Sequence, residues 1–386
     1  MKERKRILLV IPRPTRGGAT QVLLNLLHED IARTKFRFYT LYNDSSVQKD
    51  ALSQVVERSF ASPLDKPSRM RNLLIKFSPS LYSILKKWHL SWVCYTLKPD
   101  IIYINTVSQT PHAQQALKMG IPLVLHAHEM DFLVTQKMNE KWVSELVIKV
   151  PTWIVCARAV GEFYQTVYKL PPEKQKLLHG PASVARLTST HPGKYKKAVN
   201  CSSEFILIGV CASFTYLKGA DIFIKAIQLV KRSYKEQIRF AWLGLDEQVK
   251  DSVFYNSMIS LVQQYGLEQD FFMFSTTAEV GDFYTDIDVL VHPSRTEAFP
   301  LSILEAMLFA KPVVAMDVGG IREVVDEATG YLVKDRTPEG LAEGIRYLVT
   351  SEDRRRQAGQ KGRQRVLEKF EAGVQAPKWL NLLDNL

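Results

Sequence analysis

Several features that define secreted, membrane-spanning or metal-binding proteins are missing from this sequence. Its longest apolar run near the N-terminus covers residues 7–11, too short for a signal peptide or a membrane span. The four cysteines, Cys94, Cys156, Cys201 and Cys211, have neither paired nor metal-type spacing, so we expect free thiols in a reducing cytosol. No nucleic-acid-binding module is recognisable, although the formal net charge of +11 indicates an anionic partner.

Two common nucleotide-binding motifs are absent as well. No G-x-G-x-x-G and no Walker lysine follows the first predicted strand, which argues against a dinucleotide fold and a nucleotide-hydrolysing loop. The segment after this strand does contain Gly17 and Gly18, and a predicted helix begins near Gln21. A strand, a glycine pair and a helix start can form a phosphate or ligand site, although most glycine pairs are simple turns.

The apolar pattern predicts two α/β domains. The 386 residues are enough for two domains, and 46% apolar with 24% charged residues is typical of a soluble globular protein. Short apolar runs alternate with helical patterns, for example residues 100–104 followed by 111–119, which predicts parallel sheets with helices on both faces. The predicted parts are an N-terminal domain (1–185), a linker rich in small and polar residues (186–203), a C-terminal domain (204–365) and a terminal helix (366–386).

The most informative stretch follows a short predicted strand at residues 289–291. Residues 301–310 are apolar nearly all round, which predicts a buried helix with Pro300 at its first position. The first N–H groups of a helix have no intrahelical partner and attract anions. Glu297 precedes this anion site and Glu305 follows it.

Two carboxylates on either side of a phosphate-binding helix start would suit a nucleotide sugar, which carries hydroxyls on both sides of a diphosphate. A carboxylate is costly to bury without a partner, so Glu305 requires an explanation. The alternative is that Glu297 is a solvated loop residue and that Glu305 pairs with a core arginine.

These residues and the segments that follow them, at 311–314, 318–325 and 329–333, resemble the donor-binding signature of family 4 retaining glycosyltransferases, also called group 1. The resemblance implies the α/β GT-B fold: two doubly wound Rossmann-like domains facing across a cleft, the first on the acceptor side and the second binding the nucleotide sugar. It implies that Glu297 contacts the transferred sugar and that Glu305 holds the ribose hydroxyls. It also implies that the terminal helix crosses back to the N-terminal domain.

The resemblance implies further residues of the site. Lys218, between a predicted strand and a predicted helix, would reach the diphosphate as a point charge. Gly17 and Gly18 would face the donor phosphates, and His128 at a strand end would lie near the sugar and the acceptor. The predicted catalytic residues are His128, Glu297 and Lys218. The predicted donor-binding residues are Gly17, Gly18, Ser213, Lys218, Glu297, Ala298, Phe299, Pro300, Leu301 and Glu305.

One position departs from the family pattern. The family has an arginine five residues before the lysine, where this chain has Ser213. Arg158, Arg295 or helix N–H groups are candidates to balance the second phosphate charge. The alternative is that Ser213 marks a weakened or inactive enzyme.

One pair of histidines and one pair of aspartates have spacings that are also found in metal sites. His126 and His128 form an H-x-H pair, but no third ligand is visible nearby. Asp286 and Asp288 match the metal-binding pair of glycosyltransferases with a different fold, but they precede a strand instead of following one. We therefore expect no metal and no cofactor, with the nucleoside diphosphate sugar as co-substrate.

Residues 66–98 contain seven lysines or arginines and no acidic residue. Aromatic side chains alternate with these cations: Phe77, Tyr82, Trp88, Trp92 and Tyr95. Such a composition is typical of a peripheral contact with an anionic membrane. The alternative is a helix pair on the sheet with its lysines in solvent.

The sequence thus predicts a retaining, metal-independent hexosyltransferase. We expect it to move a sugar from a nucleoside diphosphate sugar to a glycan or lipid-linked acceptor, in surface polysaccharide or glycoconjugate biosynthesis, and to bind no nucleic acid. The expected location is the cytoplasm. The basic stretch at 66–98 further suggests contact with the inner face of the cell membrane. The alternatives are a non-catalytic scaffold or partner protein of the same fold, and a sugar-nucleotide epimerase.

Overall fold

The computed structural model describes residues 3–11, 17–42, 49–61, 73, 77–187, 191–202, 204–234, 238–250 and 252–386. The chain forms two compact units, one made of Met1–Pro181 with Ala372–Leu386 and the other of Ala182–Glu371. Residues 12–16 of the predicted glycine loop, residues 66–72 and 74–76 of the basic stretch, and residues 188–190 and 203 of the predicted linker lie outside the described residues.

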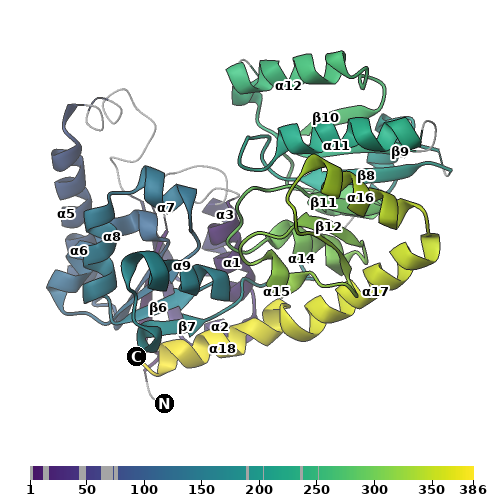
Figure 1. Cartoon of the computed structure of the whole chain (residues 1–386). Coiled ribbons are helices and arrows are strands. Elements are labelled where there is room, and N and C mark those ends of the chain that lie inside the picture. The colour runs from purple at the N-terminus through teal and green to yellow at the C-terminus, as the bar shows by residue number, and fades with distance from the viewer. Residues whose placement is uncertain are drawn as a thin grey trace. The chain divides into compact units, whose positions relative to one another are not determined.

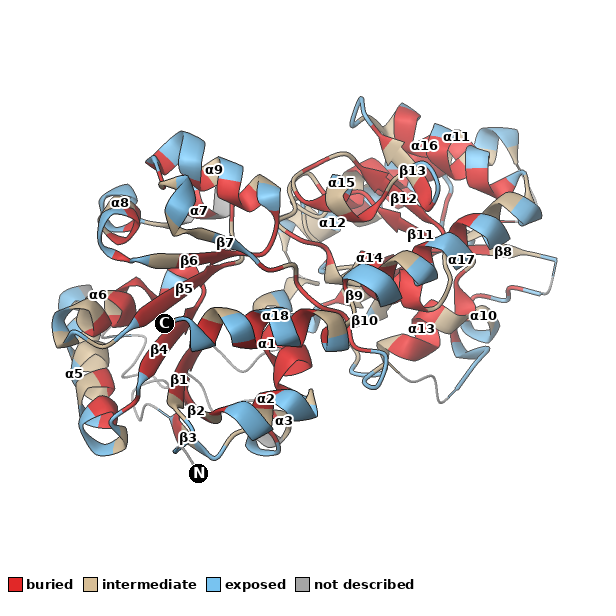
Figure 2. Ribbon diagram, turned by 90° about the horizontal axis from the view of Figure 1, so that it is seen from below, coloured by how far each residue is buried: buried red, intermediate tan, exposed pale blue. Residues whose placement is uncertain are grey.

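In the described part of the first unit, seven parallel strands form one sheet in the order β3-β2-β1-β4-β5-β6-β7. The strands are β1 (Arg6–Ile11), β2 (Arg37–Tyr42), β3 (Arg58–Ala61), β4 (Ile101–Asn105), β5 (Leu123–Ala127), β6 (Thr152–Val155) and β7 (Gln175–Leu177). The central strands are buried along their length (Figure 2), as expected for a parallel sheet covered on both faces. The strand order reverses between β1 and β4, and the carboxyl ends at such a point are where open α/β sheets bind ligands.

The helices of the first unit lie around this sheet (Figure 1). They are α1 (Gly18–Leu27), α2 (Asp30–Lys35), α3 (Lys49–Ser53), α5 (Pro79–Leu97), α6 (Thr110–Met119), α7 (Phe132–Lys137), α8 (Glu140–Lys149), α9 (Arg158–Tyr168) and α18 (Ala372–Asp384), with 3-10 turns η2 (Val107–Gln109) and η3 (Pro172–Lys174). No helix in the described part of the chain is both long and apolar enough to cross a bilayer.

The C-terminal helix α18 is part of the first unit although 190 residues separate it from the rest of that unit. It packs on α1 and α2, and its fully buried Trp379 stacks on Phe38 with ring centroids 5.3 Å apart. The ring of Tyr103, on β4, is nearly perpendicular to the same indole, with the ring centroids 6.0 Å apart. Lys35 pairs with Asp384 at 2.9 Å near the helix end. Aromatic packing therefore fixes the terminal helix on the N-terminal sheet.

In the described part of the second unit, six parallel strands form a sheet in the order β10-β9-β8-β11-β12-β13. The strands are β8 (Ile206–Cys211), β9 (Ile238–Leu245), β10 (Phe271–Ser275), β11 (Val289–His292), β12 (Val313–Met316) and β13 (Gly330–Val333). The order reverses between β8 and β11, so the loops that follow these two strands start side by side. Those loops contain most of the predicted donor-site residues.

Helices surround the second sheet as well (Figure 1). They are α10 (Lys194–Ala198), α11 (Ala220–Ser233), α12 (Val253–Gln264), α13 (Val280–Asp286), α14 (Leu301–Leu308), α15 (Ile321–Val324), α16 (Pro338–Val349) and α17 (Glu352–Lys369), with the 3-10 turn η4 (Glu247–Val249). The segment predicted as a linker belongs to this unit, because the Asp286 carboxylate accepts hydrogen bonds from the backbone N–H groups of Gly193 (2.6 Å) and Tyr195 (2.7 Å). The chain passes between the units at Pro181–Ala182 and Glu371–Ala372.

Candidate functional site

Two loops meet at the reversal point of the second sheet, one after β8 and one after β11. Gly219 has a φ of +73°, and a Cβ at this position would lie 2.0 Å from the carbonyl oxygen of Pro293. A glycine is therefore required for this close approach. Between the same loops, the N–H of Arg295 donates to the carbonyl of Leu217 at 2.9 Å. These contacts bring Lys218 and Glu297 together although 79 residues separate them.

The Glu297 carboxylate is the centre of a charged cluster. Its Oε2 accepts a hydrogen bond from Lys218 Nζ at 2.7 Å and lies 3.0 Å from Nε2 of His292, while its side chain is only 12% exposed. Burial alone would raise the pKa of Glu297, but the positive charge of Lys218 and the hydrogen bond with His292 lower it to about 2. The solvated-loop interpretation of Glu297 is therefore wrong. The site holds an ionised carboxylate beside an ammonium group.

His292 belongs to this cluster and was not predicted. It ends β11, is nearly fully buried, and also lies 3.1 Å from Oγ of Ser294. The one signal in the sequence is a polar residue at the end of an otherwise apolar strand. The buried His292 therefore helps to fix the orientation of the Glu297 carboxylate.

Arg295, a candidate to replace the missing family arginine, is held by other groups. Its guanidinium donates two hydrogen bonds to the Asp221 carboxylate, at 2.8 and 2.7 Å. It also stacks 3.7 Å from the ring of Tyr216 and donates to that residue's carbonyl oxygen. A bidentate pair of this kind neutralises the arginine and fixes its plane. Arg295 thus joins α11 to the β11 loop.

Glu305 lies one turn inside α14, with 8% of its surface exposed. Its Oε1 accepts a hydrogen bond from Arg186 at 3.1 Å and its Oε2 from the Tyr284 hydroxyl at 2.9 Å. Burial raises the pKa of Glu305, although Arg186 and Tyr284 oppose this effect. The sequence left open that Glu305 pairs with an arginine, and the structure contains such a pair, formed with Arg186. Its contact with ribose hydroxyls stays a prediction.

The start of α14 lies between the two glutamates in the chain. The helix begins at Leu301, so Pro300 precedes the first helical residue and its carbonyl accepts from Ile303 and Leu304 at 3.2 and 3.3 Å. Phe299 is buried and its ring packs 5.7 Å from that of Phe370. The early N–H groups of this helix are the expected phosphate contacts.

Ser213 is exposed in the loop after β8. The backbone around it is fixed on β9, because the Trp242 indole donates to the carbonyl of Ala212 at 2.7 Å and Phe214 N–H donates to Gly244 at 3.3 Å. Gly244 itself has a φ of +126°, and a Cβ there would lie 2.2 Å from the Ala212 carbonyl oxygen. The position therefore has a defined backbone but only a short side chain.

The predicted residues of the first unit lie at the carboxyl ends of its central strands and the start of α1. His128 follows β5, where its Nε2 lies 3.0 Å from Oδ1 of Asn105 at the end of β4, and burial lowers its pKa to about 3. Glu129 accepts from the N–H groups of His128 and Val107, at 3.1 and 3.3 Å, and so joins the two strand ends. Gly17 is the residue before α1, and a Cβ at Gly18 would meet no atom within 4 Å.

Comparison with known protein families assigns nearly the whole chain. Residues 194–365 match the model of glycosyl transferases group 1, and residues 16–186 match that of glycosyltransferase family 4. The chain belongs to the family 4, group 1 glycosyltransferases. The predicted family is confirmed.

Solved structures show the same fold over the full length of this family 4 glycosyltransferase. The structure of Anabaena HepE in complex with UDP and glucose has a TM-score of 0.81 at 19% identity, covering 99% of this chain and all of that chain. Sucrose-phosphate synthase from Thermosynechococcus elongatus has a TM-score of 0.79 at 18% identity, covering 99% of both. The fold is GT-B, as predicted.

The curated relatives align with this chain over only part of their length. The chain is 24% identical over 277 residues to a poly(ribitol-phosphate) alpha-N-acetylglucosaminyltransferase of Staphylococcus aureus, a match that covers 70% of this chain and 52% of the relative. It is 25% identical over 234 residues to the O-antigen biosynthesis glycosyltransferase WclY of Escherichia coli, covering 60% of this chain and 61% of the relative. The matched regions thus span little more than half of these proteins.

The aspartate pair of this glycosyltransferase has structural contacts. Asp286 caps the segment that leads into α10, and Asp288 accepts from the N–H of Leu207 at 2.7 Å and from Lys196 Nζ at 3.2 Å. Within the described residues, one group of side chains has metal-like proximity: His191, Glu279 and Asp282. The ammonium of Lys194 lies 3.7 Å from Glu279 and 3.9 Å from Asp282, so these two carboxylates already have a positively charged neighbour. Metal independence of the reaction stays a prediction.

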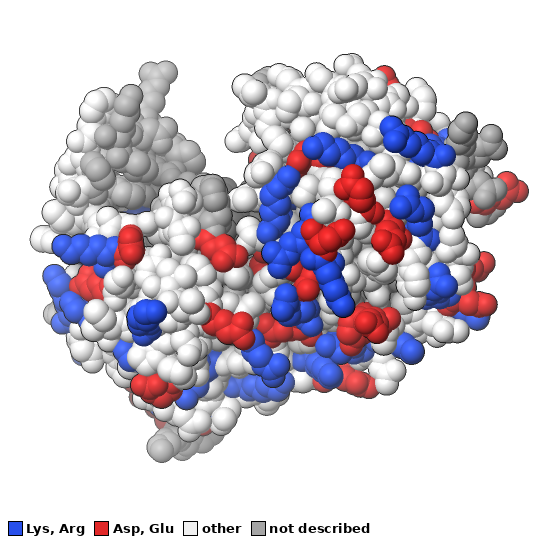
Figure 3. All heavy atoms as spheres, in the orientation of Figure 1, with Lys and Arg blue, Asp and Glu red and all other residues white. Residues whose placement is uncertain are grey.

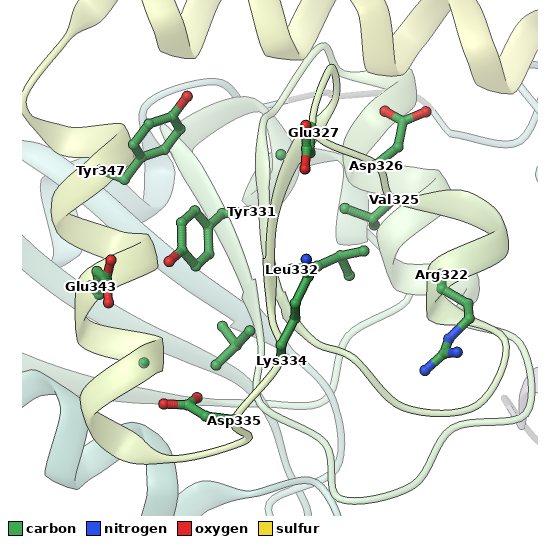
Figure 4. Close-up of a pocket in the computed structure, with 13 residues that line it drawn as sticks. Arg322, Val325, Asp326, Glu327, Tyr331, Leu332, Lys334, Asp335, Glu343 and Tyr347 are labelled. Carbon is green, nitrogen blue, oxygen red and sulfur yellow. The ribbon is translucent and has the colours of Figure 1, made fainter.

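A hollow of about 730 Å³ lies at the β13 edge of the second sheet, with none of the predicted site residues in its lining (Figure 4). The rings of Tyr331 and Tyr347 lie on one side of it, 5.5 Å apart, and Arg322 on the other. Ligands of doubly wound sheets bind at the reversal point, which this edge is not. The candidate site is therefore the Lys218–Glu297 cluster with the start of α14.

Proposed function

We propose that this protein transfers a hexose from a nucleoside diphosphate sugar to a glycan or lipid-linked acceptor, with retention of configuration and without a metal ion. The observation that carries the proposal is the pair of Lys218 and Glu297, 2.7 Å apart at the reversal point of the second sheet and directly before α14. An ammonium group and a helix start are both suited to a diphosphate, and the carboxylate is suited to sugar hydroxyls.

The proposed chemistry breaks the bond between the anomeric carbon and the diphosphate oxygen and forms a bond from that carbon to an acceptor hydroxyl oxygen. The acceptor proton goes to the departing diphosphate, which leaves as the nucleoside diphosphate. Lys218 and the first N–H groups of α14 would stabilise the negative charge that develops on the leaving oxygen. Attack from the side of the leaving group would retain the configuration, with Glu297 orienting the sugar.

Glu305 and His128 would have binding roles. Ribose hydroxyls that reach Glu305 must share its carboxylate with Arg186 and Tyr284, which contact one oxygen each. The neutral His128, held by Asn105, would contact the sugar or the acceptor. The named relatives act on poly(ribitol-phosphate) and in O-antigen biosynthesis, which supports a surface glycan as acceptor class. HepE was crystallised with UDP, so UDP-sugars are the first donors to test.

The test is nucleotide release from UDP-, GDP- and ADP-sugars, combined with thermal-shift measurements, since a ligand that binds the folded state raises the unfolding temperature. We expect one nucleotide class to stabilise the protein, and Lys218→Ala and Glu305→Ala to lose turnover. Lys361→Ala and Glu368→Ala, exposed on α17, are matched controls. Turnover that is unchanged in the first two variants would contradict the assigned roles.

Ser213 favours one second candidate, a non-catalytic protein that binds the donor. The position lacks the family arginine, and Arg295 is already paired with Asp221. Donor binding without transfer to any supplied acceptor, and recovery of transfer in Ser213→Arg, would support this candidate.

A further inference from the structure

The outward face of α5 carries a stripe of large apolar side chains. Its members are Leu81, Ile84, Trp88, Trp92 and Tyr95, with intervals of three or four residues that place them on one side of the helix. Trp88 is 75% exposed and Tyr95 is 81% exposed. We refer to these five residues as the α5 stripe. It is an exposed apolar patch of the kind that marks an interaction surface.

The opposite face of α5 is what holds the helix on the first unit. Leu90, Val93 and Cys94 are buried there, and Gln115 of α6 donates a hydrogen bond to Ser91 Oγ at 2.9 Å. The α5 stripe therefore contributes little to the core of the unit. A helix that is apolar on both faces normally has a neighbour on both.

Positive charge lies next to the stripe. Between α5, α6 and α8 is a hollow of about 350 Å³, lined by Lys87, Gln114, Leu117, Lys118, Glu145 and Lys149. A hydrogen bond from Lys149 lowers the pKa of Glu145, so this carboxylate is ionised. Three lysines and one glutamate leave an excess of two positive charges in the hollow. In Figure 3 the described surface over α5 is mainly uncharged, with blue side chains below it.

We infer that the α5 stripe and this lysine hollow together form a docking surface for an anionic lipid bilayer. Tryptophan and tyrosine rings favour the headgroup level of a membrane, where one end is apolar and the other is hydrated. Lysines beside them attract anionic headgroups. A second copy of the chain fits less well, because a two-fold contact through the same patch would bring the two lysine hollows towards each other. The inference goes beyond the proposed transfer reaction and does not depend on it.

The experiment is co-sedimentation of the full chain with vesicles of phosphatidylcholine alone or mixed with phosphatidylglycerol. We expect binding to the anionic vesicles, weaker binding at high salt, and little binding to the neutral ones. The double variant Trp88→Ser/Tyr95→Ser removes two exposed rings and should lower the partition coefficient by about tenfold or more. Lys87→Glu/Lys118→Glu should lower it by about tenfold or more as well, because two charges are reversed near the surface.

Matched controls lie on the second unit. Val253→Ser removes an exposed apolar side chain, and Lys361→Glu reverses an exposed charge; both should bind vesicles like the wild type. The stripe variants should keep the wild-type thermal shift with a nucleotide sugar, which separates this inference from the proposed function. Equal vesicle binding by the stripe variants and the controls would overturn the inference. The inference would also be overturned if the chain bound no vesicles and light scattering showed a dimer that dissociates in Trp88→Ser.

Discussion

Replacement of Lys218 by methionine tests the charged cluster most severely. The change keeps the length and apolar stem of the side chain but leaves the buried Glu297 carboxylate without the ammonium group 2.7 Å away. Because one pKa unit corresponds to about 1.4 kcal/mol, the lowering of the Glu297 pKa from 4.5 to about 2 corresponds to about 3 kcal/mol in favour of the ionised form. Most of this stabilisation at pH 7 should disappear in Lys218→Met.

The sign of the pH dependence follows from the same shift. The folded-state pKa of Glu297 is depressed, so its contribution is complete above about pH 5 and is lost as the pH falls toward 2. The wild type should therefore lose more stability than Lys218→Met over this interval. For a unit the size of the second one, a loss of about 3 kcal/mol lowers the unfolding temperature by about 6 to 12 °C.

The assay is thermal unfolding at pH 7 and at several lower values, with Lys361→Met, an exposed lysine on α17, as the control. Sugar transfer by Lys218→Met, measured in parallel, should fall by about 100-fold or more, because the change removes the cation that we propose stabilises the leaving diphosphate. An unfolding temperature equal to that of the wild type at pH 7, with the same pH dependence, would refute the reasoning.

Three further predictions concern other positions. Glu305→Gln should weaken nucleotide binding by about tenfold or more, since the proposed hydrogen bond from the ribose would no longer be made to a charged group; calorimetric titration against Glu368→Gln measures this. Gly219→Ala should destabilise the second unit by about 1–3 kcal/mol or more, because a Cβ would lie 2.0 Å from a carbonyl oxygen. Gly266→Ala, with a φ of +62° but no atom within 4 Å, separates strain from the clash in the same denaturation experiment. Trp379→Ala should cost the first unit about 3–5 kcal/mol, and a loss below about 1 kcal/mol on chemical denaturation would contradict the packing of α18 described above.

The parts of the fold that follow from local sequence were predictable. Residues 301–310 were expected to form a buried helix, and α14 spans Leu301–Leu308; the difference lies at the C-terminal end, where Ala310 has a φ of +55°. Pro300 was expected at the first helical position and instead precedes it, a shift of one residue. The regular alternation of apolar runs and helical patterns predicted both parallel sheets, because the central strands of each sheet are buried on both faces.

The partners of the site residues were not predictable, since they come from distant parts of the chain. Arg186, which contacts Glu305, lies 119 residues before it, in a segment expected to be a linker. Tyr284 and His292 are polar groups on buried elements, and only the folded arrangement shows that they orient the two glutamates. The residues alone left a solvated Glu297 open as an alternative, because no local residue indicates its contact with Lys218 across 79 residues.

A crystal of the protein soaked with a UDP-sugar gives the most direct test of the central claim, which is that the reversal point of the second sheet binds an activated sugar. We expect the diphosphate within hydrogen-bonding distance of Lys218 Nζ and the first N–H groups of α14, with Glu297 at the sugar and Glu305 at the ribose. Density for the ligand in the hollow beside Tyr331 and Tyr347 (Figure 4), with the Lys218–Glu297 cluster unchanged, would contradict the claim.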